Sequence, residues 1–95
     1  MKADLLLRER VILTASSFVE MVVWKLSASV PGSSHQFKYR LAYVVENSCV
    51  IRFDNEVGKG DHKHIGEQEV PYQFIDLETL RADFFMEIRA RRMNT

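Results

Sequence analysis

The sequence predicts an α+β fold, a four- to five-stranded antiparallel meander with a C-terminal helix packed on one face. Runs rich in β-branched and aromatic residues alternate with turn residues over the first half of the chain. Apolar residues then recur at helical spacing near the C-terminus. The length of 95 residues and the hydrophobic share of 46% suit one folded domain, which we expect to span residues 1–95.

The first two strands are predicted at residues 4–13 and 18–27, on either side of a small polar turn. The first strand alternates, and its apolar face consists of Leu5, Leu7, Val11 and Leu13. The second strand is apolar on both faces around Val22 and Val23. It is therefore expected to be central, or to place one face against a partner, a second copy of this chain included.

The third and fourth strands are predicted at residues 36–45 and 49–54, joined by a three-residue loop at 46–48. This loop sets Tyr43 opposite Ile51, so that apolar side chains meet, whereas a two-residue loop would set Arg52 opposite Leu41. We choose the first register. It gathers four polar side chains on one face of the sheet, namely Lys38, Arg40, Arg52 and Asp54.

The C-terminal part of the chain predicts one helix and, at most, one further strand. Residues 67–72 form a polar connection or an edge strand that ends at Pro71. A helix is expected from residue 77 to about 91, with Asp76 as its N-cap and arginines in its last turn. Its apolar stripe would cover the apolar face of the meander and leave the face with the cations open.

The segment 53–66 concentrates the residue types that carry chemistry. It contains three glycines, two lysines, two aspartates and two of the three histidines of the chain. The glycines allow a sharp bend around Lys59. If residues 61–65 are extended, His62 and His64 leave the strand on the same face and can meet one target.

Composition narrows the classes of function. No apolar run is long enough to span a bilayer, and the charged N-terminus does not resemble a signal peptide, so no membrane partner is expected. The single Cys49 suits a reducing cytoplasm and is expected to be buried, whereas His35 is expected to be exposed without a partner. The net charge of zero argues against nucleic-acid binding by bulk charge alone.

Several motifs resemble the TumE family. They are residues 40–45 (Arg-Leu-Ala-Tyr-Val-Val), residues 53–56 (Phe-Asp-Asn-Glu), residues 58–64 (Gly-Lys-Gly-Asp-His-Lys-His), and Leu80, Asp83 and Phe84. The resemblance covers nearly the whole chain, and Lys63 stands where the family often has Arg. It implies the toxin half of a type II toxin–antitoxin pair whose partner is a small DNA-binding antitoxin.

Small bacterial toxins most often cut RNA, and the side chains suit that reaction without a cofactor. Cleavage needs a base, an acid and cations that hold the phosphate. We assign the acid–base pair to His62 and His64, with Asp61 or Asp54 orienting one of them. The side chains assigned to hold the RNA phosphate, or to assist there, are Lys38, Arg40, Arg52, Lys59 and Lys63.

Two other interpretations stay open. In the first, a divalent metal for phosphodiester hydrolysis is bound by Asp54, Asp61, His62 and His64. Against it, the spacing matches no strong zinc signature, and the cations Lys59 and Lys63 are interleaved with the ligands. Alternatively, the protein is a non-enzymatic binding module for an antitoxin or a nucleic acid. Each residue also has a plainer interpretation, as part of a solvated sheet face or a tight turn.

Overall fold

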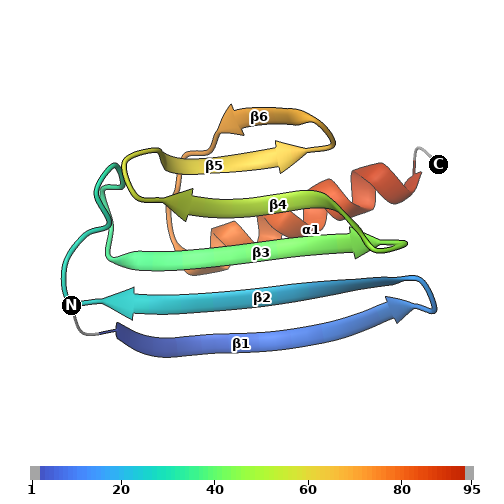
Figure 1. The fold of residues 1–95 in the computed structure, drawn as a ribbon, viewed down its shortest axis with the longest axis horizontal. Helices are drawn as coiled ribbons and strands as arrows, with labels where there is room; N and C mark the ends of the chain where they lie inside the picture. The colour runs from blue at the N-terminus through green and yellow to red at the C-terminus, as the bar shows by residue number, and fades with distance from the viewer. Residues whose placement is uncertain (1–2, 94–95) are drawn as a thin grey trace.

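The computed structural model describes residues 3–93, which form a six-stranded antiparallel sheet and one helix (Figure 1). The elements are β1 (Ala3–Thr14), β2 (Ser17–Leu26), β3 (Phe37–Val45), β4 (Ser48–Glu56), β5 (Gly60–Ile65), β6 (Gln68–Pro71) and α1 (Leu77–Met93). The strands follow one another across the sheet in chain order. The α+β meander is confirmed, but the predicted number of four to five strands was too low.

The strand that raises the number to six is β5, in the middle of the segment with the glycines and histidines. Only residues 57–59 turn, and β5 then pairs with β4 from Gly60, opposite Glu56, to Ile65, opposite Ile51. On its other side β5 pairs with β6, the predicted edge strand. Glycine, aspartate and lysine are poor strand formers, but strand propensity depends on the neighbours, and here both neighbours are strands.

The core lies between α1 and one face of the sheet. The helix turns a stripe of Leu80, Phe84 and Ile88 to the strands, and Phe84 meets Phe53 of β4 edge to face at 5.7 Å between ring centroids. In Figure 1 the helix runs behind the strands, and within residues 3–93 no helix lies over the front of the sheet. We call this front the open face.

Helix α1 begins and ends as its sequence predicts. The backbone N–H of Thr79 donates to Oδ1 of Asp76 at 2.7 Å, which confirms the N-cap, and Arg91 and Arg92 lie in the last turn. Over residues 3–93, no helix combines the length and the apolar character that crossing a membrane requires.

The predicted register between β3 and β4 is confirmed, but the turn that produces it is different. Tyr43 pairs with Ile51, and Arg40 pairs with Asp54. The turn has two residues, Glu46 and Asn47, whose φ angles of 49° and 68° are typical of a tight hairpin. A bulge next to Tyr43 then supplies the extra residue that restores the register. Near this turn Cys49 is exposed, so its predicted burial was wrong.

Two glycines hold the loop between β2 and β3 against the turn between β4 and β5. Gly32 and Gly60 have φ angles of 95° and 77°, and a Cβ on Gly60 would lie 2.7 Å from the carbonyl oxygen of Gly32. The N–H of Gly58 donates to the carbonyl of Pro31 at 2.7 Å across the same contact. Glycine is therefore required at Gly60 both by its backbone conformation and by the close approach.

We expect Gly60→Ala to lower the free energy of unfolding by at least about 2 kcal/mol, because it adds a steric clash to backbone strain. Gly58→Ala is the matched control, since Gly58 has a similar φ of 82° but open space where a Cβ would project. It should cost only the strain, about 1 kcal/mol. Urea unfolding of both variants measures the difference, and equal losses would show that the contact with Gly32 is unimportant.

Candidate functional site

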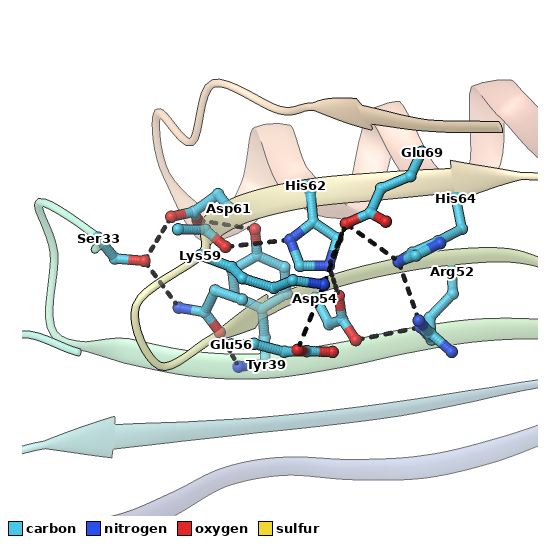
Figure 2. Close-up of polar contacts among 12 residues, drawn as sticks. Ser33, Tyr39, Arg52, Asp54, Glu56, Lys59, Asp61, His62, His64 and Glu69 are labelled. Carbon is cyan, nitrogen blue, oxygen red and sulfur yellow. Dashed lines mark hydrogen bonds and ion pairs between the residues drawn. The ribbon is translucent and has the colours of Figure 1, made fainter. Parts of the chain in front are cut away.

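The pairing of β4 with β5 builds a polar cluster on the open face. Arg52 lies opposite His64 and Asp54 lies opposite His62, and residues two apart on a strand share a face. The four side chains therefore project together, as the spacing of the histidines predicts, and we call them the open-face site (Figure 2).

The deepest part of the site is the contact between Asp54 and His62, whose side chains are only 9% and 5% exposed. Oδ1 of Asp54 lies 2.8 Å from Nε2 of His62. Although the distance is short, neither atom has an aligned hydrogen bond within the described residues. On the other side of the ring, Nδ1 of His62 donates to the carbonyl of Gly60 at 3.1 Å.

The more accessible part of the site is formed by Arg52 and His64, whose side chains are 29% and 25% exposed. Nη2 of Arg52 donates to Nε2 of His64 at 2.9 Å, and Nε of Arg52 lies 3.1 Å from Oδ2 of Asp54. A guanidinium has no acceptor atom, so Nε2 of His64 must carry a lone pair and Nδ1 its proton. The rings of His62 and His64 lie 5.0 Å apart between centroids.

Charged side chains from the neighbouring segments cover the site. Lys59 reaches over it from the turn before β5, with its ammonium 3.6 Å from Glu69 and 3.9 Å from Glu56 (Figure 2). Oε1 of Glu69 lies 3.5 Å from Nε2 of His62 and 3.9 Å from Nε2 of His64. Glu69 was not among the predicted site residues, because only the pairing of β6 with β5 sets it opposite His64.

The other predicted cations on this face lie on β3. Arg40 is exposed beside Asp54, its partner across the strands. Lys38 donates its ammonium to the backbone carbonyl of Asn55. The open face therefore carries the three cations that were predicted to share it, Lys38, Arg40 and Arg52.

Asp61 and Lys63, both predicted to belong to this site, face the other side of the sheet. They alternate with the histidines along β5, so they project towards the side that α1 covers. Lys63 lies 3.8 Å from Glu87 of the helix. Neither side chain can touch a molecule bound at the open-face site, and the carboxylate that lies against His62 is that of Asp54.

Asp61 instead accepts three hydrogen bonds in a second, fully paired cluster. Its oxygens accept from the hydroxyls of Ser33 and Tyr39 at 2.6 and 2.7 Å, and one of them lies 2.6 Å from Nε2 of His35. The N–H of Phe37 donates to Nδ1 of His35, so Nε2 carries the proton and donates to Asp61. His35 also stacks on Phe74 at 3.8 Å, so its predicted exposure without a partner was wrong.

Two tyrosines, one of them in this second cluster, make the stability of the protein change with pH in the alkaline range. Burial raises the pKa of Tyr39, and the hydrogen bond to Asp61 and the charge of Asp61 raise it further. Burial likewise raises the pKa of Tyr72, together with its hydrogen bond to Asp83. An unfolded tyrosine ionises near pH ~10, so above that pH the unfolded chain binds fewer protons than the folded one.

We therefore expect the free energy of unfolding to fall as the pH rises above about 10, whereas below that value the contribution of both tyrosines is fully present. In Tyr39→Phe the fall should be less steep, because one of the two groups no longer titrates. Urea unfolding at pH values from about 8 to about 11.5 measures both slopes. An identical slope in the wild type and in Tyr39→Phe would contradict this account.

Together the fold and the open-face site define a small α+β protein with a cluster of arginine, aspartate and histidine on an uncovered sheet face. The chain belongs to the TumE family, since the family model described as Toxin TumE matches residues 2–92. It is therefore a toxin of a toxin–antitoxin system, and a cognate antitoxin is implied as its partner. No curated protein and no solved structure matches the chain significantly.

Proposed function

We propose that this toxin is an endoribonuclease that cleaves phosphodiester bonds of single-stranded RNA at the open-face site. The observation that carries the proposal is the position of Arg52 and His64, which are partly exposed and lie directly in front of the buried Asp54–His62 contact. A guanidinium that can hold a phosphate thus lies within hydrogen-bond reach of an imidazole that can transfer a proton.

The residues of the site differ in their access to a substrate, and this difference assigns their roles. His64 is the imidazole that RNA can reach, whereas His62 is nearly covered and acts from behind it, held by its hydrogen bond to the carbonyl of Gly60 and adjacent to Asp54. Arg52 binds the scissile phosphate. Lys38, Arg40 and Lys59 provide further positive charge along the approach of the RNA backbone.

An aromatic platform for a base adjoins these cations on the same face. Trp24 of β2 is half-buried and pairs across the strands with Lys38, while its neighbour Val22 pairs with Arg40. An aromatic ring beside cations is the arrangement on which single-stranded nucleic acids stack their bases. Because Trp24 is the single tryptophan of the chain, RNA that binds here should change the intrinsic fluorescence of the protein.

The experiment is to incubate the purified toxin with single-stranded RNA and to follow both cleavage and tryptophan fluorescence. Wild-type protein should cleave, and Arg52→Ala should lose most of the cleavage. Lys63→Ala is the matched control, because Lys63 lies on β5 between the histidines but faces the helix side. The proposal is rejected if the wild type leaves RNA intact, or if Arg52→Ala and Lys63→Ala cleave equally.

The binding-module interpretation makes the opposite prediction for the histidines. A protein that acts only by holding a partner would keep its toxicity in cells when His62 or His64 is replaced. An enzyme would lose its toxicity while it still bound its antitoxin. Toxicity and antitoxin binding measured on the same variants therefore separate the two functions.

A further inference from the structure

We propose that Asp54, His62 and His64 form a binding site for one divalent transition-metal ion, with Glu69 as an additional oxygen ligand. Each of the three residues offers one ligand atom, and these atoms lie within 4.8 Å of one another. Two imidazoles and a carboxylate suit Zn²⁺, Mn²⁺ or Fe²⁺ better than Mg²⁺, which prefers oxygen ligands and water. The inference concerns ion binding and does not depend on RNA being the substrate.

The first argument is the position of two buried polar atoms. Nδ1 of His62 donates to the carbonyl of Gly60, and Nε2 on the other side of the ring lies 2.8 Å from Oδ1 of Asp54. Nε2 and Oδ1 are both buried, and neither has an aligned hydrogen bond within the described part of the chain. A cation bound by both atoms would satisfy them, and buried polar groups without a partner are costly.

The second argument is that the surrounding groups orient the ligands as they do in metal sites. A metal-binding histidine usually donates its second N–H to a carbonyl or a carboxylate, as His62 does to Gly60. Asp54 divides its two oxygens, with Oδ2 towards Arg52 and Oδ1 towards His62. The lone pair on Nε2 of His64 and the nearby Oε1 of Glu69 face the same space.

Two lysines, Lys59 and Lys63, are interleaved with the proposed ligands in the sequence. In the folded protein their positions do not prevent an ion from binding. Lys63 lies on the other side of the sheet, against Glu87. The side chain of Lys59 is 56% exposed, so its ammonium can leave Glu69 for solvent when an ion binds. Arg52 can keep its contact with Oδ2 of Asp54 and give up the one with His64.

With three protein ligands the site leaves a coordination position for water or a phosphate oxygen, which is typical of catalytic rather than structural metals, and an octahedral ion such as Mn²⁺ keeps open positions even when Glu69 binds. A bound ion would lower the pKa of a bound water and polarise the phosphate, the chemistry that RNA hydrolysis needs. With an ion bound, His62 and His64 would serve as ligands in place of the proton transfer proposed above, and Arg52 would still hold the substrate.

The test is to strip the full chain with a chelator and to titrate it with Zn²⁺ and with Mn²⁺ by calorimetry. We expect one ion per chain, and at least a roughly tenfold weaker affinity in His62→Ala and in His64→Ala. Lys63→Ala should bind like the wild type. Lys59→Ala should bind the ion severalfold more tightly, because a competing cation is gone. A purely structural role for the histidines would not produce this gain in affinity.

Absence of stoichiometric binding, or equal affinity in His64→Ala and the wild type, would overturn the inference. Circular dichroism identifies any variant that has lost affinity only because it is unfolded. In that case the variant His64→Gln is used instead, and the visible absorption of bound Co²⁺ reports directly whether the ion is ligated. The outcomes also separate the two proposals. An ion that binds without RNA cleavage rejects the nuclease and retains the site, whereas a chain that cleaves RNA but binds neither Zn²⁺ nor Mn²⁺ in the titration rejects the site and retains the nuclease.

Discussion

His64→Ala is expected to lower the rate of RNA cleavage by about 10²- to 10⁴-fold, the usual contribution of a positioned proton-transfer group. The loss should be large because the side chain of His64 is 25% exposed, whereas that of His62 is only 5% exposed, so His64 is the imidazole that a substrate can touch. The measurement is single-turnover cleavage of a labelled single-stranded RNA, together with growth of cells that express the variant.

The control for this experiment is Lys63→Ala, which removes a charge next to His64 but on the other face of the same strand. Its ion pair with Glu87 is worth no more than about 1 kcal/mol, so the fold should tolerate the change. If cleavage survives in His64→Ala and disappears in Lys63→Ala, the reaction takes place on the helix side and the open-face site is not its centre.

Asp61→Ala is expected to destabilise the fold by at least about 3 kcal/mol, since it removes the acceptor of three hydrogen bonds at once. Tyr39 is buried and the side chain of His35 is 11% exposed, so both would be left with a donor of little access to water, and an unpaired buried donor costs about 1–3 kcal/mol. Small domains have only about 5–15 kcal/mol of total stability. The free energy of unfolding in urea measures the loss.

A second aspartate provides the comparison. Asp83 accepts one hydrogen bond, from the hydroxyl of Tyr72 at 2.6 Å, and it is only partly buried. Asp83→Ala should therefore cost about 1 kcal/mol, and Asp61→Asn, which keeps one acceptor oxygen, should lie between the two. If Asp61→Ala is no more destabilising than Asp83→Ala, the cluster around Asp61 does not hold the β2–β3 loop to the sheet.

The strands were predictable to the extent that their side chains alternate. The strand at residues 36–45 alternates cleanly, and β3 was found at Phe37–Val45 with Tyr39 and Leu41 in the core. The strand β5 does not alternate in this way, because both its faces carry polar groups. Its existence depends on hydrogen bonds to β4 and β6, which are formed with residues elsewhere in the chain.

The candidate site was predictable in part for the same reason. The spacing of His62 and His64 places them on one face of any strand, and the register of β3 with β4 places Arg40 and Asp54 together. The same alternation separates Asp61 from the histidines, but the sequence does not fix the pairing of β4 with β5 that brings Asp54 against His62. The structure pairs Asp54 with His62 and gives Asp61 to Ser33, His35 and Tyr39.

The sequence by itself determined the α+β class, the helix with its cap at Asp76, the register that sets Arg40 opposite Asp54, and the family resemblance. The first three depend on residue periodicity and on the matching of faces between strands close in the chain, and the resemblance depends on the motifs themselves. Only the tertiary structure decided that Asp54 lies against His62 and that Glu69 joins the site. Each of those outcomes depends on which strands become neighbours, and burial and charge are defined only once they do.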